Sequence, residues 1–100
     1  MRGFSTIKKK PLSNMALFPV SSNFEGDFVI QLVPVDTENT MDEVAAACAV
    51  HSINRRVAPR PGKILRVRRH SDGTLFARNM KLADAGLMPT ETIDILFMDA

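Results

Sequence analysis

The stretch FVIQLVPVDTENTMDEVAAAC, residues 28–48, changes from a strand pattern to a helix pattern and decides the fold. Phe28, Ile30 and Leu32 alternate with their neighbours, so they share one face of a strand predicted over residues 28–35. Pro34 has no amide hydrogen to donate to a neighbouring strand. We therefore expect this strand to lie at the edge of a sheet or to end at the proline.

A helix is predicted directly after this strand. Thr40 and Glu43 have the spacing of a capping box, in which the hydroxyl and the carboxylate each accept a free amide of the first turn. An apolar stripe with helical spacing follows, made of Met41, Val44, Ala45 and Cys48. The pattern fades near residues 52–54, where Arg55 and Arg56 suit the negative end of the helix dipole.

Further strands are predicted on both sides of this helix. Their ranges are 17–24, 64–70, 75–78 and 92–97, with a glycine-containing turn over 25–27 and one helical turn over 82–85 that Gly86 ends. The order β-β-α-β-β-β, with one helix covering a mixed sheet, is that of the ubiquitin-like β-grasp fold in the α+β class. Another small α+β sheet with one covering helix is the alternative.

The chain divides into a short basic leader and one domain. Residues 1–14 hold four basic side chains and no acidic one, and we expect them to be a flexible extension. Residues 15–100 form the predicted β-grasp domain, and Met15 is also a possible start. This domain has nine basic and eleven acidic residues, so it is near neutral. Near neutrality weakens a nucleic-acid-binding interpretation.

Positive charge is concentrated in residues 55–69, which hold seven basic side chains and no acidic one. In the strand predicted over 64–70, Leu65 and Val67 face one side, and Arg66, Arg68 and His70 face the other. We therefore predict a protein-protein interface that contains Arg55, Arg56, Arg66, Arg68 and His70. The alternatives are a solvated face that protects a sheet edge and a nucleic-acid contact.

The residues predict no catalytic, cofactor-binding or metal-binding site. His51 and His70 are the two histidines, Cys48 is the one cysteine, and no nucleotide-binding, nucleophile or zinc motif occurs. Cys48 lies among alanines, so a buried apolar role in a reducing compartment is expected. No export signal or membrane span is recognised, and the ending Met-Asp-Ala argues against a conjugated modifier. We expect a cytoplasmic protein.

Several stretches resemble a known family, namely residues 27–36, 40–45, 51–57, 64–70 and 84–94. The family is that of the small γ subunit of the hydroxylase in bacterial toluene/benzene/o-xylene multicomponent monooxygenases. The resemblance covers about residues 18–97 without an obvious gap, and the leader is its one departure.

The resemblance implies a β-grasp fold and a non-catalytic, structural role. In that family a large α subunit carries the diiron centre, and a β and a γ subunit complete a dimer of three-chain protomers. Electrons pass from NADH through an FAD-containing reductase and a Rieske ferredoxin, and an effector protein regulates turnover. The class that remains open from the residues is a free-standing ubiquitin-like adaptor or weak nucleic-acid-binding module.

Overall fold

The computed structural model describes residues 17–100. Its elements are β2 (Leu17–Phe24), β3 (Gln31–Asp36), α1 (Met41–Val50), β4 (Lys63–Arg69), the 3-10 helix η1 (Leu82–Asp84) and β5 (Thr92–Asp99). The extension predicted over residues 1–14 lies outside the described residues. No helix within residues 17–100 has the length and apolar character needed to cross a membrane.

The four strands form one mixed sheet in the order β3-β2-β5-β4. β2 pairs with β3 and β4 pairs with β5 in antiparallel fashion, and β2 and β5 run parallel at the centre. This is the predicted β-grasp arrangement, which the structure confirms. Pro34 lies in β3, an outer strand of the sheet, so its edge position is also confirmed.

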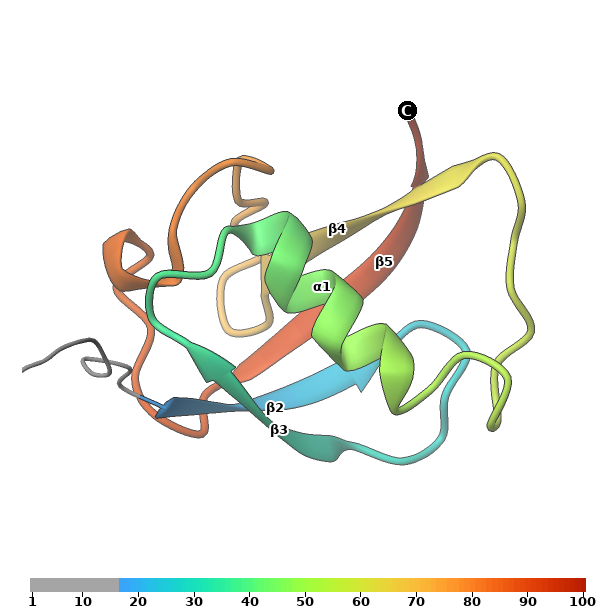
Figure 1. The fold of residues 1–100 in the computed structure, drawn as a ribbon, viewed down its shortest axis with the longest axis horizontal. Coiled ribbons are helices and arrows are strands. Elements are labelled where there is room, and N and C mark those ends of the chain that lie inside the picture. Colours follow the sequence, from blue (N-terminus) through green and yellow to red (C-terminus); the bar gives the residue numbers. More distant parts are fainter. Residues whose placement is uncertain (1–16) are drawn as a thin grey trace, which may run out of the picture.

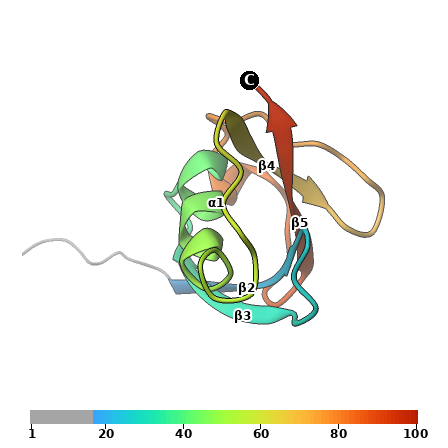
Figure 2. The ribbon, with the colours of Figure 1, turned by 90° about the vertical axis from the view of Figure 1, so that its right-hand side faces the viewer.

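The sheet curves around α1, which packs against one of its faces (Figures 1 and 2). The core lies between them and includes Val20, Phe24, Val44, Ile93 and Ile95, each at most 1% exposed. No helix or strand among the described residues covers the opposite face of the sheet, so that face has no second layer there.

The capping box that the sequence predicts is present. The amide of Thr40 donates to Glu43 Oε1 at 2.8 Å, and the amide of Glu43 donates to Thr40 Oγ1 at 3.3 Å. Cys48 is fully buried in the helix stripe, and burial raises the pKa of its thiol to about 11. An un-ionised, buried thiol is a poor nucleophile, which agrees with the apolar role predicted for Cys48.

The strand predicted over residues 75–78 is wrong. The segment makes one short bridge to β4, where the Phe76 amide donates to the Val67 carbonyl at 3.0 Å. The chain then turns towards α1, because the Arg78 and Met80 carbonyls accept the amides of Asp42 and Met41. These two bonds satisfy free amides of the helix start, and they divert the backbone from the sheet.

The second strand begins at Gln31, three residues later than predicted. The amide of Val29 donates to Asp27 Oδ1 at 3.1 Å, so a side chain takes the backbone donor that a strand neighbour would otherwise accept. The turn therefore extends through residues 25–30.

We predict that Thr40→Ala lowers the free energy of unfolding by about 1 kcal/mol, because the variant loses the hydroxyl that accepts the Glu43 amide. Urea denaturation followed by circular dichroism measures this change. Thr37→Ala is the control, since the Thr37 hydroxyl makes no hydrogen bond within residues 17–100. Equal stability of the two variants would contradict a stabilising cap.

Candidate partner interface

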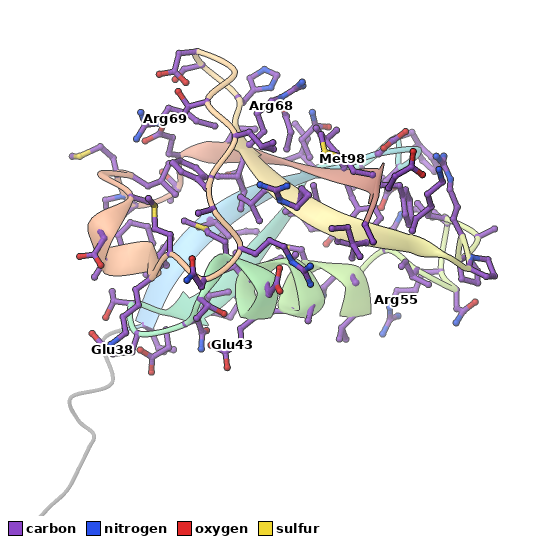
Figure 3. The ribbon with its side chains drawn as sticks, turned by 90° about the horizontal axis from the view of Figure 1, so that it is seen from above. Glu38, Glu43, Arg55, Arg68, Arg69 and Met98 are labelled. Carbon is purple, nitrogen blue, oxygen red and sulfur yellow. The ribbon has the colours of Figure 1, made fainter. Side chains whose placement is uncertain are left out.

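The sheet has an outer face, which we define as the side chains of its strands that point away from α1. Burial alternates in β2, where Phe24 lies on the core side, and the register with β2 places Ile95 of β5 on that same side. The outer face consists of Leu17, Pro19, Ser21, Asn23, Leu32, Pro34, Asp36, Ile64, Arg66, Arg68, Thr92, Asp94, Leu96 and Met98, together with His70 directly after β4. Figure 3 shows Arg68 and Met98 on the side of the sheet opposite the helix.

A charged cluster occupies the middle of the outer face. Register places Asn23 of β2 and Arg68 of β4 directly beside Asp94 of β5, one on each side. Asn23 Nδ2 donates to Asp94 Oδ1 at 2.9 Å, and Arg68 donates twice to Oδ2, at 3.0 and 2.8 Å. His70 Nδ1 lies 2.8 Å from Oδ1. We call these four residues the Asp94 cluster.

The cluster keeps a nearly buried carboxylate charged. Asp94 is 2% exposed, and burial alone would raise its pKa, since an apolar environment disfavours the charged form. The hydrogen bonds from Asn23, Arg68 and His70 outweigh burial and hold the pKa below its ordinary value. Part of the charge of Arg68 therefore neutralises Asp94 within the same sheet. The Arg68 side chain remains 41% exposed, so it can also contact a partner.

Arg66 is bound less tightly than Arg68. Its Nη2 donates to the Phe76 carbonyl at 2.9 Å, and it forms no ion pair with an acidic side chain within residues 17–100. Among the outer-face arginines of β4, which we call the arginine strand, Arg66 is thus the one most available to pair with a carboxylate of a partner protein. Arg69, which follows Arg68, points to the other side of β4, where it donates to the Ala85 carbonyl at 2.6 Å and pairs with Glu91.

Arg55 and Arg56 lie at a different place from the outer-face residues. Arg55 Nε donates to the Val50 carbonyl at 2.9 Å, and Arg56 Nη2 donates to the His51 carbonyl at 2.7 Å, so both satisfy the end of α1. Figure 3 places Arg55 on the helix side and Arg68 on the opposite side. The five residues predicted for one interface therefore fall into two groups, and only Arg66, Arg68 and His70 share the outer face.

Arg56 has an internal partner that the sequence did not reveal. Its Nε lies 2.7 Å from Asp27 Oδ1, and Ser52 Oγ donates to Asp27 Oδ2 at 2.7 Å. The Asp27 side chain has no exposed area, and the hydrogen bond from Arg56 holds its pKa well below the ordinary range against the opposing effect of burial. This pair joins the turn between β2 and β3 to the end of α1.

Sequence reasoning missed two parts of the outer surface. One is Asp94, whose signal is a single charge inside the apolar run over residues 93–97. The other is a group of exposed apolar side chains, with Phe28 86%, Ile30 59% and Leu32 62% exposed. Their shared face was predicted, but alternation alone does not say whether such a face meets the core or solvent.

A cluster of metal-ligating side chains is not found in the part of the chain that the structure describes. No group of three or more His, Cys, Asp or Glu side chains lies close enough together there to hold a metal ion. The arrangement of the outer face, with a charged cluster and exposed apolar residues, is suited to contact with another protein.

Comparison with known families agrees with the resemblance found in the sequence. The family model described as "Toluene-4-monooxygenase system protein B (TmoB)" matches residues 17–97. The hydroxylase component subunit gamma of the toluene-4-monooxygenase system of Ectopseudomonas mendocina is 53% identical over 83 residues, which cover 83% of this chain and 98% of the relative.

Two further similarities extend this finding. The oxygenase component subunit gamma of the alkene monooxygenase system of Xanthobacter autotrophicus is 51% identical over 47 residues, covering 47% of this chain and 53% of the relative. A chain in the solved structure "Toluene 4 monooxygenase HD Complex with Inhibitor 4-Bromobenzoate" is 52% identical and superimposes with a TM-score of 0.79. The match covers 83% of this chain and all of that chain.

The two buried carboxylates predict how stability depends on pH. The folded pKa values of Asp27 and Asp94 lie below the unfolded value of about 3.9. Their contribution to the free energy of unfolding is therefore complete above that pH, and it is lost as the pH falls towards the folded pKa values. We expect the urea midpoint to be steady from pH 7 to 5 and to fall below about pH 4.

Asp94→Asn tests this dependence directly. At pH 7 the free energy of unfolding of the variant should be lower by about 1–3 kcal/mol, because the buried side chain at position 94 no longer accepts charge-assisted hydrogen bonds from Arg68. Its loss of stability on acidification should also be shallower than in the unmodified chain. Asp84→Asn, at an exposed position of η1, is the control and should leave both quantities unchanged. A steep acid transition retained in Asp94→Asn would show that the cluster does not contribute.

Proposed function

The chain belongs to the family of toluene-4-monooxygenase system protein B, and on that basis we propose that it is a non-catalytic structural subunit of an aromatic-ring monooxygenase. In this proposal it acts as the γ subunit of the hydroxylase and docks on the large subunit. The observation that carries the proposal is the 53% identity over 98% of a hydroxylase γ subunit.

The proposal assigns the chemistry to other chains. The large subunit would hold the diiron centre, which supplies the oxygen chemistry, and NADH, FAD and a Rieske cluster would serve in partner proteins. The large α and middle β subunits would join this chain in a dimer of three-chain protomers in the cytoplasm, served by a reductase, a ferredoxin and an effector protein. The lack of a three-ligand cluster within residues 17–100 is compatible with this division.

An aromatic substrate is the finer part of the proposal. Its support is the toluene-4-monooxygenase relative, which matches nearly along its whole length, whereas the alkene monooxygenase relative matches over 47 residues. We propose that toluene, benzene or xylene is the substrate class of the complex.

The surface that supports docking best is the arginine side of the outer face, formed by Arg66, Arg68 and His70. These side chains point away from the helix, and Arg66 has no acidic partner within the described part of the chain. Arg55 and Arg56 were predicted to join them, but their position at the end of α1 separates them from this surface. We therefore assign docking to the outer-face group.

Co-expression with the large and middle hydroxylase subunits tests the function. We expect this chain to co-purify with them in equal amounts, and the isolated chain to bind no iron by elemental analysis. A chain beginning at Met15 should assemble equally well, because the family model starts at residue 17. An isolated chain that binds iron, or one that stays monomeric beside its co-expressed subunits, would contradict the proposal, and the latter result would favour a free-standing adaptor.

The arginine surface is tested by Arg66→Gln, with Arg55→Gln as the matched control. Both arginines donate to a backbone carbonyl and neither has an acidic partner within residues 17–100, yet only Arg66 lies on the outer face. If Arg66 pairs with a desolvated partner carboxylate, its loss should weaken assembly by roughly 2–5 kcal/mol. Arg55→Gln should change assembly by about 0–1 kcal/mol.

The affinity of each variant for the other subunits can be measured by titration with the purified subunits. Arg68→Ala is a poorer probe, because it leaves the buried Asp94 carboxylate without its main cation and so affects folding as well as docking. Equal affinities for Arg66→Gln and Arg55→Gln would contradict docking through Arg66 and would support the alternative that the arginine strand is a solvated sheet face.

A further inference from the structure

The hairpin of β2 and β3 exposes an apolar surface that the arginine-based interface does not include. We define the hairpin surface as Leu17, Phe28, Ile30, Leu32 and Pro34. Four of these side chains are large and well exposed, with Leu17 72%, Phe28 86%, Ile30 59% and Leu32 62% exposed. Burial alternates from residue 28 to residue 35, with Val33 and Val35 in the core, so Leu32 and Pro34 share the outer side.

The two arms of this hairpin carry a single charged side chain, Asp36 at the last position of β3. Residues 17–24 and 28–35 contain no Asp, Glu, Lys, Arg or His. Outer strands of soluble proteins usually carry charges that discourage contact with other chains. The depletion of charge at β3 is therefore the pattern of a surface that another protein covers, since the centre of an interface is poor in charged residues.

The two acids at the hairpin turn are both used internally. Glu25 Oε1 accepts the Phe97 amide at 2.8 Å, and Glu25 Oε2 lies 3.2 Å from Arg60. Asp27 is held by Arg56 and Ser52, as described above. These bonds fix the turn to β5 and to the end of α1, so Phe28, which is 86% exposed, lies in a segment that is held on both sides.

The hairpin surface is comparable in size with the largest apolar patch of a typical monomer, and such a patch is often functional. The exposed parts of its four large side chains amount to on the order of 500 Å² of apolar area. That largest patch covers about 300–600 Å², and a standard interface buries about 800 Å² on each partner. The hairpin surface can therefore supply most of the apolar part of one docking area.

We propose that the hairpin surface is the apolar anchor of this subunit, with Phe28 and Leu32 seated in an uncharged apolar cleft of the large hydroxylase subunit. This inference rests on the proposed function, which supplies the partner. The lack of charge selects an apolar protein surface, because a nucleic acid requires cations opposite its phosphates. Pro34 lacks the amide that a continuous strand pairing with a second copy would need, so the partner packs on the outer side.

In this arrangement the hairpin surface supplies the apolar contacts and the arginine side supplies the charged contacts of one interface. Both belong to the outer side of one sheet, with β2 and β3 at one end and β4 at the other. An apolar centre beside a charged margin is the usual organisation of a protein-protein interface. Arg56 then has an indirect role, because it holds Asp27 and thereby positions the turn that carries Phe28.

The test compares Phe28→Lys and Leu32→Lys with the control Val50→Lys. Val50 is also apolar and 64% exposed, but it lies at the last residue of α1, where a lysine suits the helix dipole. A lysine at Leu32 is compatible with an outer strand. We expect each hairpin variant to lower the affinity for the co-expressed large and middle subunits about 30-fold or more, as loss of an interface hot spot does, and Val50→Lys to leave it unchanged.

Thermal unfolding of the isolated chains provides the folding control, since all three variants should melt within a few degrees of the unmodified chain. A photo-crosslinking amino acid at position 28 identifies the occupant, and it should join this chain to the large subunit. Hairpin variants that assemble like Val50→Lys would overturn the inference and leave the proposed function intact. A crosslink to the middle subunit, or to a second copy of this chain, would also overturn it.

If the unmodified chain itself fails to bind the other subunits, the proposed function is overturned and the inference falls with it. The two failures are distinguishable, because the first appears only in the hairpin variants and the second in every chain. Sedimentation of the isolated chain completes the test. A dimer that Phe28→Lys converts to a monomer would assign the surface to a second copy and overturn the inference.

Discussion

The structure depends on the insertion of β5 between β2 and β4. This last strand runs parallel to the first described strand and antiparallel to β4, so it joins the two ends of the domain into one sheet. The insertion brings Asn23 and Asp94 together, although 71 residues separate them in the sequence. A carboxylate at such a central position would be costly to bury alone, and its three side-chain partners come from the two strands that flank β5 or from directly beyond β4.

The same topology also explains why the basic stretch over residues 55–69 does not form a strongly basic surface. Most of its charges have acidic partners elsewhere in the domain: Arg56 with Asp27, Arg60 with Glu25, Lys63 with Asp99, Arg68 with Asp94, and Arg69 with Asp72 and Glu91. Folding thus distributes the local excess of positive charge among acids of which all but Asp72 lie far away in the sequence. The near-neutral composition of the domain is matched by pairing at its surface, and a strongly basic face does not result.

Exposure of apolar residues is the feature of the outer surface that composition does not explain. A soluble domain of this size shows scattered apolar side chains, but residues 28–35 expose several on one hairpin arm without a charge among them. Family membership provides a context for this pattern, since the relatives named γ subunits belong to hydroxylase and oxygenase components. An outer strand that a partner protein covers does not need charged side chains to prevent unwanted pairing.

Local patterns in the sequence determined the helix, its capping box, the edge position of Pro34 and the β-grasp order of elements. These features depend on neighbours within a few residues, through hydrogen bonds near the chain and through the period of apolar side chains. The strand expected over 75–78 does not form, because the carbonyls of Arg78 and of Met80 just beyond it accept amides from the start of α1, which is distant in the sequence. Which arginines are free, and whether Phe28 faces core or solvent, was decided only by tertiary structure. Charge pairing and burial depend on distant segments that meet when β5 enters the sheet, and no local pattern encodes those meetings.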